Sequence, residues 1–256
     1  MKNPLFKTEV KENLAFSIVI ITLNEENYVG KLLTQLEKQT YKNFEVIVVD
    51  GQSEDKTIDI LREHEEGLDL NILISNTAGP SIQRNIGAKA ARYNNLIFFD
   101  ADILVNESFM EELEGKIRKR AKIDCLTSRY IPYPSSWFSK LAMNIEHSYA
   151  KTVSKIAPIV QGAFIYVKKD VFKKVGGFEE ELRYGEDSHF VRKLHKAGYN
   201  FVILTNPVVL YSMRRLKRDG KIKFILQGIK AGMILRKENY VEMLKKVEYK
   251  FGHYDD

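Results

Sequence analysis

The sequence has little of what marks a secreted or membrane-spanning protein. Its single cysteine, Cys125, cannot form a disulfide within the chain, so a reducing compartment is the simplest expectation. The opening residues, MKNPLFKTEVKEN, lack the apolar core of a signal peptide. The longest apolar runs, such as FSIVIIT, fall far short of the ~18–20 residues that cross a bilayer. We therefore expect a cytoplasmic protein.

The chain does have the composition of an ordinary globular protein. Its 256 residues, 44% hydrophobic and 29% charged, suffice for one large α/β domain and argue against disorder. The net charge of +6 is concentrated in residues 214–249, where basic side chains can attract the phosphates of a nucleotide, a nucleic acid or an anionic lipid. A solvated helix face is an equal alternative. Residues 221–235 fit either a helix packed on the protein, which we favour, or one lying on the inner face of a membrane.

Short apolar runs alternate with segments of helical periodicity through the first part of the chain. The predicted strands are SIVIIT, EVIVV, NILIS and LIFF, and helices are predicted over residues 25–39, 57–64 and 81–92. Strict alternation of this kind predicts βαβ units with a parallel sheet. Ligands bind beyond the carboxyl ends of such strands. Asn24-Glu25, Asp50 and Asp100-Ala101-Asp102 follow three of these runs, so we expect them to share one site.

The pattern is looser in the second half. Helices are predicted over residues 107–120, 170–175, 187–197 and 221–246, strands over 160–167, 201–204 and 208–212, and an aromatic, proline-containing loop over 130–138. No repeat, low-complexity tract or linker interrupts the chain. A single domain with two lobes is therefore the preferred organisation.

Two carboxylates separated by one residue follow the LIFF strand, as Asp100-Ala101-Asp102. Carboxylate oxygens are hard ligands of the kind that Mg²⁺ and Mn²⁺ prefer. Turns also favour Asp, which is the alternative explanation. The position directly after a buried strand favours a metal or ribose site.

Other polar residues have both a structural and a chemical interpretation. Asp50 begins a turn that ends in Ser53, a candidate helix cap, yet a carboxylate there can also bind a base or ribose. Arg84 fits a surface arginine or a ligand of a pyrophosphate. Glu186 and Asp187 open a helix, where they suit the helix dipole, but either carboxylate can also accept a proton from an acceptor hydroxyl.

The order of these motifs resembles family 2 glycosyltransferases of the GT-A fold. The similar stretches are SIVIITLNEENYVGKLLTQLEKQTYKNFEVIVVDGQSEDKT, GPSIQRNIGAKAA, FFDADI and QGAFIYVKKDVFKKVGGFEEELRYGEDSHFVRKLHKAGY, and together they cover about residues 16–215. The resemblance implies a Rossmann-like, mostly parallel sheet flanked by helices, a mixed acceptor-side lobe and a helical C-terminus. It divides the chain into a nucleotide-sugar-binding half (about 16–105), an acceptor half (106–215) and a basic tail (216–256).

The resemblance also implies roles for the matching residues. On the donor side it implies nucleotide contacts for Thr22, Asn24, Glu26, Asp50, Arg84 and Asp100. Asp102, together with Asp100, would hold Mn²⁺ or Mg²⁺. Arg214 or Arg215 would meet the diphosphate. UDP is the default nucleotide because it is common among similar enzymes, and no nucleic-acid partner is expected.

On the acceptor side the resemblance implies that Asp187 is the general base, supported by Glu186, and that Gly162 lies where the acceptor site begins. Trp137, within the aromatic segment 130–138, would stack on an acceptor sugar or contact lipid, with core packing as the alternative. The expected reaction adds one sugar with inversion to a saccharide or lipid-linked saccharide, since the QxxRW motif and membrane helices of processive synthases are lacking.

Two other functions remain open. A nucleotidyltransferase acting on sugar phosphates would share the sheet and the carboxylates, but it usually has a glycine-rich, basic loop after the first strand, and the loop here, TLNEENYVGK, is acidic. A non-catalytic sugar- or lipid-binding protein would keep the same fold without turnover. The spacing of His147, His189 and His195 is not that of metal ligands, so a structural or solvated role is expected for them.

Overall fold

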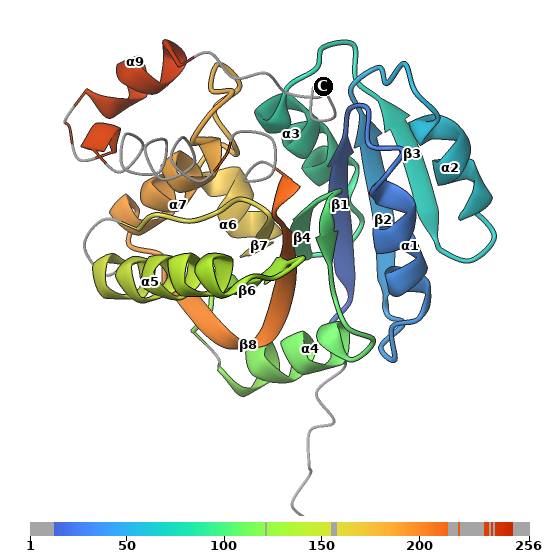
Figure 1. Cartoon of the computed structure of the whole chain (residues 1–256), viewed down its shortest axis with the longest axis horizontal. Helices are drawn as coiled ribbons and strands as arrows, with labels where there is room; N and C mark the ends of the chain where they lie inside the picture. Colours follow the sequence, from blue (N-terminus) through green and yellow to red (C-terminus); the bar gives the residue numbers. More distant parts are fainter. Residues whose placement is uncertain are drawn as a thin grey trace, which may run out of the picture.

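A computed structural model describes residues 13–120, 122–154, 158–214, 220, 233–235, 237 and 239–247 (Figure 1). In this part of the chain an eight-stranded sheet runs in the order β3-β2-β1-β4-β7-β6-β8-β5. The strands are β1 (Phe16–Thr22), β2 (Phe44–Asp50), β3 (Leu70–Ile74), β4 (Asn95–Asp100), β5 (Ile103–Leu104), β6 (Cys125–Tyr133), β7 (Phe164–Lys168) and β8 (Phe201–Ser212).

Helices cover both faces of the sheet. They are α1 (Val29–Glu37), α2 (Thr57–Glu63), α3 (Pro80–Ala90), α4 (Phe109–Lys119), α5 (Trp137–Val153), α6 (Lys169–Lys174), α7 (Glu186–Lys196) and α9 (Tyr240–Lys245). The apolar sides of α1, α2 and α4 pack in one core on one face, and those of α3, α6 and α7 pack in a second core on the other. The resulting three-layer arrangement is visible in Figure 1.

The central strands are buried on both faces. In β1, Ile18 and Ile20 point into the first core and Val19 into the second, and all three are fully buried. Full burial of such a side chain contributes roughly 1.5–3 kcal/mol relative to leaving it in water. This explains why the strand sequences are continuously apolar rather than alternating.

The sheet is parallel in its first half and mixed in its second. Strands β3, β2, β1 and β4 pair in parallel, whereas β7 is antiparallel to both β4 and β6, and β8 is parallel to β6. The predicted fold class is therefore confirmed. In this register Thr22 pairs with Asp50 and Ile21 with Asp100, which brings the carboxyl ends of three strands to one edge.

The prediction of a loop over residues 130–138 is wrong. Its first part belongs to β6, which lies between β7 and β8, and its last residues begin the 17-residue helix α5. Ser136 caps α5 through a reciprocal capping box with Ser139. The strand was missed because its partners lie far away in the sequence and its prolines indicated a loop.

Two smaller predictions also differ from the structure. Residues 201–204 and 208–212 are parts of one strand, β8, which pairs with β6 across an irregularity between Ser128 and Tyr130. Ser53 does not cap α2, because the helix begins at Thr57 and the Ser53 hydroxyl instead donates to Asp50.

Part of the predicted C-terminal helix, residues 221–232, and Arg215 lie outside the described residues. Within the described residues, α9 follows in the C-terminal segment and packs its Leu244 with Leu182. Nowhere in the described part does a helix have the length and apolar character needed to cross a membrane.

Candidate active site

The Asp50 carboxylate is fixed beneath the loops that follow β1 and β2. It is fully buried and accepts hydrogen bonds from the Thr22 hydroxyl (2.9 Å), the Ser53 amide (2.8 Å) and the Ser53 hydroxyl (2.5 Å). Thr22 is fully buried as well. Both residues thus stabilise the loops at the base of the site. Their expected contact with a nucleotide stays a prediction.

The two loops are also joined directly. Asn24 has a positive φ of 55°, a conformation that Asn tolerates better than most residues. Its side-chain oxygen accepts from the Glu54 amide (2.9 Å), and Glu26 accepts from the Lys56 amide (3.0 Å). Asn24 and Glu26 therefore shape this edge of the site, and their predicted nucleotide contacts remain predictions.

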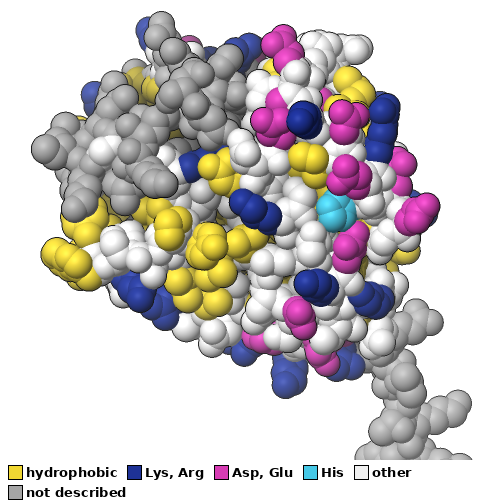
Figure 2. Space-filling model, turned by 45° about the vertical axis from the view of Figure 1, so that its right-hand side comes forward, with side chains coloured by type: hydrophobic (Ala, Val, Ile, Leu, Met, Phe, Trp, Pro, Cys, Tyr) yellow, Lys and Arg dark blue, Asp and Glu magenta, His cyan; other side chains and the backbone are white. Residues whose placement is uncertain are grey.

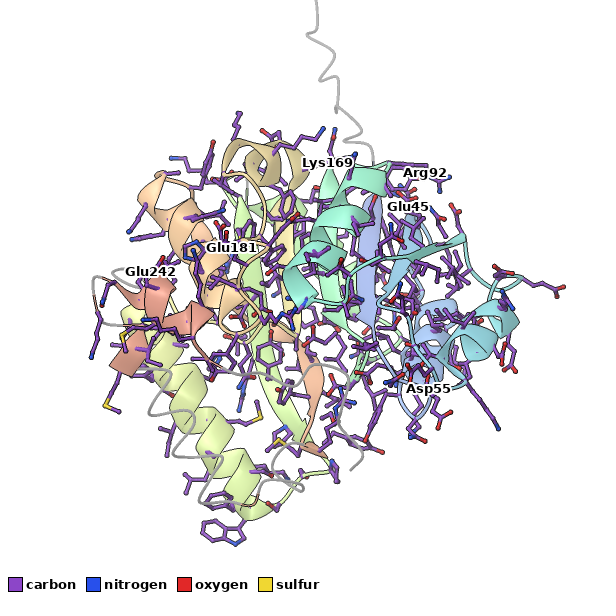
Figure 3. The ribbon with its side chains drawn as sticks, turned by 90° about the horizontal axis from the view of Figure 1, so that it is seen from above. Glu45, Asp55, Arg92, Lys169, Glu181 and Glu242 are labelled. Carbon is purple, nitrogen blue, oxygen red and sulfur yellow. The ribbon has the colours of Figure 1, made fainter. Side chains whose placement is uncertain are left out.

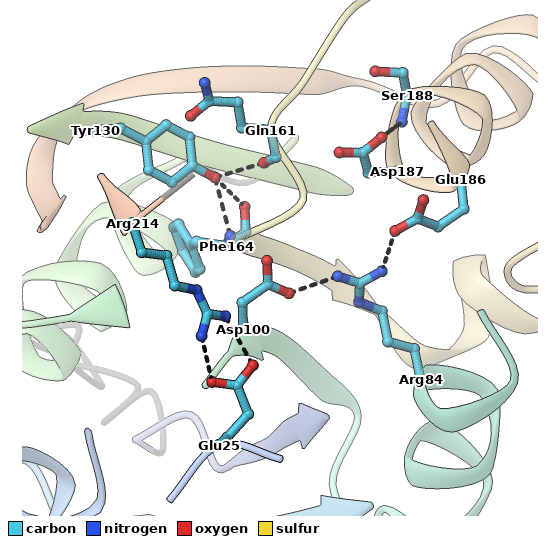
Figure 4. A network of polar contacts seen from close by, with 10 residues as sticks. All are labelled: Glu25, Arg84, Asp100, Tyr130, Gln161, Phe164, Glu186, Asp187, Ser188 and Arg214. Carbon is cyan, nitrogen blue, oxygen red and sulfur yellow. Dashed lines mark hydrogen bonds and ion pairs between the residues drawn. The ribbon is translucent and has the colours of Figure 1, made fainter. Parts of the chain in front are cut away.

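Arg84 links the donor side of the site to the helix that carries the predicted base. Only 2% of its side chain is exposed, and its guanidinium bonds Asp100 and Glu186 at 2.7 Å each (Figure 4). Burial disfavours its charge, but the two carboxylates raise the pKa of Arg84, which therefore stays protonated. The surface alternative is wrong, since the guanidinium is enclosed between two acids.

A second arginine joins two further carboxylates. Arg214 forms a bidentate pair with Glu25, both N–O distances being 2.8 Å, and its Nε lies 2.8 Å from the Asp102 carboxylate. The guanidinium also lies 4.5 Å from the centre of the Tyr28 ring. Arg214, which comes after the last strand, thus reaches the loop after β1, while Asp102 is held on the same guanidinium.

Glu25 was expected to share the site with Asn24, but no role was predicted for it. Both Glu25 and Glu26 follow the first strand, and the resemblance implied a nucleotide contact for Glu26 alone. In the structure Glu25 is buried, and desolvation together with the nearby Asp102 and Asp100 carboxylates raises its pKa to about 7 despite the pair with Arg214.

Asp187 stands at the start of α7 with a raised pKa. Burial, and after it the adjacent Glu186 carboxylate, raises the pKa of Asp187 to about 7. The backbone passes close to it at Gly162, where an added Cβ would lie 2.9 Å from the Asp187 Oδ2. A glycine is therefore required for this approach, and a carboxyl group with this pKa suits proton transfer near neutral pH.

A cavity of about 480 Å³ opens on the side of the site where Arg214 pairs with Asp102. Asp102 and Arg214 line one part of it, and Tyr133, Ser136 and Ser139 line another. The cavity therefore extends from Asp102, the predicted metal ligand, to the first turn of α5. Its volume is large enough for a sugar ring and its substituents.

Trp137 follows the cavity-lining residue Ser136 in the sequence, but its side chain points to solvent. Its side chain is 77% exposed, and the preceding Tyr133 is 53% exposed. Core packing is thus wrong for Trp137. Tyr130 instead belongs to the inner structure, where its hydroxyl donates to the Gln161 carbonyl (2.7 Å) and accepts from the Phe164 amide (3.0 Å) (Figure 4).

The charge balance of the site fits a divalent cation. Among the described residues, the carboxyl groups of Glu25, Asp100, Asp102, Glu186 and Asp187 lie around two guanidinium groups, those of Arg84 and Arg214. Asp100 and Asp102 offer hard oxygen ligands. Within the described residues, no group of three or more His, Cys, Asp or Glu side chains gathers as metal ligands.

Residues 17–176, more than half of the chain, match the profile of the family described as glycosyl transferase family 2. The chain belongs to this family. The family 2 fold is also found in solved structures, which at this level of identity support the fold alone. TarS 1–349 of S. aureus in complex with UDP-GlcNAc has a TM-score of 0.65 at 22% identity, over 88% of this chain and 68% of that one. The mannosyltransferase PcManGT of Pyrobaculum calidifontis, in complex with GDP-Man and Mn²⁺, has a TM-score of 0.65 at 18% identity, over 86% and 65%.

Curated relatives are slightly more similar in sequence. The poly(ribitol-phosphate) β-N-acetylglucosaminyltransferase TarS of Staphylococcus aureus is 26% identical over 79% of this chain. The chain spans only 36% of the length of TarS. A dolichyl N-acetyl-α-D-glucosaminyl phosphate 3-β-D-2,3-diacetamido-2,3-dideoxy-β-D-glucuronosyltransferase of Methanococcus voltae is 27% identical over 86% of this chain and 74% of its own length.

The structure gathers most of the predicted site residues of this family 2 protein. Asp100, Arg84 and Glu186 form one chain of contacts, Arg214 joins Asp102 to the loop after β1, and Gly162 lies against Asp187. These contacts bring together residues from both predicted halves. Trp137 is the member of the predicted set that stands apart, at the start of α5.

Proposed function

We propose that the protein is an inverting glycosyltransferase, which transfers one sugar from a nucleotide-diphosphate sugar to a hydroxyl of a saccharide or lipid-linked saccharide. The observation that carries the proposal is the placement of Asp187. This carboxyl group, with a pKa of about 7, lies against Gly162, and its neighbour Glu186 is joined through Arg84 to Asp100. These contacts support a role for Asp187 as the base close to Asp100, one of the two proposed metal ligands.

In the proposed reaction the acceptor hydroxyl oxygen attacks the anomeric carbon while the bond from that carbon to the diphosphate oxygen breaks. Asp187 takes the hydroxyl proton, and the nucleoside diphosphate leaves from the opposite face of the sugar, so that the anomeric configuration inverts. Arg214, with Arg215 beside it in the sequence, would bind the leaving diphosphate once released from its present carboxylates.

A divalent cation held by Asp102 and Asp100 would supply positive charge to the diphosphate when bound. Support for a metal comes from the excess of carboxylates over guanidinium groups and from the Mn²⁺ bound by PcManGT. Support for a UDP-sugar donor comes from the UDP-GlcNAc complex of TarS.

The names of the relatives support an acceptor in the cell envelope or on a lipid carrier, because TarS acts on poly(ribitol phosphate) and the M. voltae enzyme on a dolichyl-linked sugar. The proposed organisation is a single catalytic domain, in which about residues 16–105 bind the nucleotide-sugar, 106–215 bind the acceptor and 216–256 form a basic tail. Its proposed location is the cytoplasm or the inner face of the membrane.

The test is a panel of nucleotide-sugars with Mn²⁺ and candidate acceptors, in which release of the nucleoside diphosphate and of glycosylated product is measured. Release of UDP with inverted product is the expected result. Formation of pyrophosphate from UTP and a sugar phosphate would instead identify a nucleotidyltransferase. Nucleotide-sugar binding without transfer or hydrolysis would indicate a non-catalytic binding protein.

A further inference from the structure

Helix α5 carries a line of apolar side chains that face solvent. Trp137, Leu141, Ile145 and Tyr149 follow one another at intervals of four residues and are 77%, 50%, 62% and 38% exposed. Residues spaced by four lie on one face of a helix. These four side chains are hereafter called the α5 stripe. Helix α5 packs against β6, and its buried residue Met143 lies on the side of the helix opposite to the stripe.

The α5 stripe is a concentration rather than scattered exposure. In the described part of the chain, the other large hydrophobic side chains that are exposed are Tyr133, just before α5, and Ile74 and Met233. Figure 2 shows hydrophobic side chains gathered on one side of the surface with lysine or arginine side chains beside them, and in Figure 3 α5 extends to the lower edge of the molecule. Contiguous exposed apolar surface of this kind marks an interaction site.

Positive charge borders the α5 stripe. Lys140 and Lys151 are both exposed and, eleven residues or three helical turns apart, lie along the same flank of the helix. Trp and Tyr at the ends of the stripe are residue types that favour the boundary between lipid and water. A helix with an apolar face, aromatic ends and flanking lysines matches the properties of helices that lie in the surface of an anionic bilayer.

A second copy of the chain fits this surface less well. Antiparallel packing of α5 on α5 would set Lys140 of one copy near Lys151 of the other, and like charges facing each other oppose association. An anionic lipid surface, in contrast, offers apolar contact and opposite charge at once.

The cavity beside the candidate active site begins where the α5 stripe begins. Ser136 and Ser139, in the first turn of α5, line the same cavity as Asp102 and Arg214. We propose that the α5 stripe lies on an anionic bilayer, so that an acceptor sugar carried by a membrane lipid enters this cavity. The lipid contact stands on the surface itself, while the delivery of the acceptor rests on the proposed function.

Trp137 makes the contact directly measurable, because it is the only tryptophan of the chain. The protein is mixed with phosphatidylcholine vesicles that contain or lack phosphatidylglycerol, and tryptophan emission, acrylamide quenching and co-sedimentation are recorded. With phosphatidylglycerol we expect a shift of emission to shorter wavelength and weaker quenching. Absence of co-sedimentation at low salt overturns the proposal, as does co-sedimentation with unchanged emission, which would place the contact elsewhere.

A matched pair of variants tests the stripe itself. The double substitution Leu141→Gln/Ile145→Gln is expected to weaken vesicle binding at least ~10-fold, since both side chains lose their apolar contact with lipid while the charge of the protein stays the same. Ile74→Gln, at an exposed apolar residue on β3 (55%), is the control and should change binding less than ~2-fold. Equal effects of the two variants overturn the proposal, and thermal melting checks that both are folded.

Catalysis and lipid contact are separated by the readout. The double variant should still hydrolyse nucleotide-sugar or use a water-soluble acceptor, while transfer to a vesicle-borne acceptor falls. If the wild-type protein turns over but does not bind vesicles, only the lipid contact is overturned. If it binds vesicles but shows no turnover, only the proposed function is overturned. A dimer in solution that the double variant dissolves would show that a second copy occupies the stripe and would overturn the lipid contact.

Discussion

Single residues in the candidate site gain their chemistry from their neighbours. Asp187 has an ordinary carboxyl group, yet burial and Glu186 raise its pKa to about 7. Arg84, which pairs with the neighbouring Glu186, remains charged because the carboxylates of Asp100 and Glu186 enclose its guanidinium. The sequence could suggest Asp187 from its position at a helix start, but the pKa and the close approach of Gly162 depend on side chains brought together by the fold.

The Asp187→Asn substitution removes the proposed base while keeping its size. Turnover is expected to fall at least ~100-fold, because an amide cannot accept the hydroxyl proton. Steady-state transfer assays measure this loss, and a thermal-shift titration with the nucleotide-sugar should show retained donor binding. Turnover at the wild-type rate would remove Asp187 from this role.

The raised pKa predicts the pH dependence of the rate. The base must be ionised to accept a proton, so kcat/KM should rise about tenfold per pH unit below the pKa of about 7 and level off above it. The same raised pKa also affects stability. Between pH 3.8, the ordinary pKa of this carboxyl group, and about pH 7, the native state binds more protons than the unfolded state. The contribution of Asp187 to the free energy of unfolding is therefore lost as pH rises through that range. Asp187→Asn should therefore raise the Tm relative to wild type above about pH 7 and hardly at about pH 4. A flat rate profile across this range would contradict the assignment.

Gly162 and Gly115 form a matched pair of glycines. In Gly162→Ala the new Cβ would meet Asp187 at 2.9 Å and displace its carboxylate, so kcat should fall roughly 10- to 100-fold. In Gly115→Ala, within α4, nothing lies within 4 Å of the new Cβ, and the variant should be stabilised by about 0.5–1 kcal/mol with unchanged turnover. Kinetics and urea unfolding of both variants test the contrast. Equal turnover in the two would contradict the close approach.

At the scale of secondary-structure elements, locally encoded units were predictable and distant pairings were not. The strands β1 to β4 and the helices between them follow from apolar runs and helical periodicity within short stretches of sequence. Strand β6 depends on β7 and β8, which come later in the chain, and its Pro132 suggested a loop. The contacts of Arg84 are of the same kind, because they join α3 to the end of β4 and the start of α7.

The junction of α3, β4 and α7 should depend strongly on its arginine. Arg84→Gln leaves Asp100 and Glu186 without their shared guanidinium, and breaking a buried ion pair in this way costs about 3–5 kcal/mol. Arg62→Gln, which removes an exposed pair with Asp59 at 3.9 Å, should cost less than ~0.5 kcal/mol. Urea denaturation measures both. A loss below about 1 kcal/mol in Arg84→Gln would mean that the pair is dispensable for the junction.

At the scale of the whole molecule, both predicted halves contribute to one group of charges. Arg214, which follows β8, binds Glu25 from the loop after β1 and Asp102 from the region after β4. The resemblance implied a metal ligand in Asp102 and a diphosphate ligand in Arg214 or Arg215. The pairing of Asp102 with Arg214 could not be foreseen, since it requires the mixed half of the sheet to lie beside the parallel half.

Binding of nucleotide and metal should therefore stabilise the folded protein as a unit. At about 100 times its Kd, a ligand that binds only the native state adds about 2.7 kcal/mol. We expect UDP with Mn²⁺ to raise the Tm more than either alone, and Asp102→Asn to lose the increment that Mn²⁺ adds. Differential scanning fluorimetry with and without EDTA measures these shifts. An undiminished Mn²⁺ effect in Asp102→Asn would place the metal on other ligands.

The pairing of Thr22 with Asp50 and of Ile21 with Asp100 limits how this protein can change over evolutionary time. Deleting one residue within β1 would shift the strand residues after the deletion by about 3.3 Å along the sheet. The buried side chains of those residues would then point to the opposite face. A change in the register of one strand is therefore not a route by which the protein can gain a new donor preference. Loops in general tolerate insertions and deletions better than strands do, so we expect new specificities to arise in the loops beyond Thr22 and Asp50 while the sheet beneath is inherited unchanged.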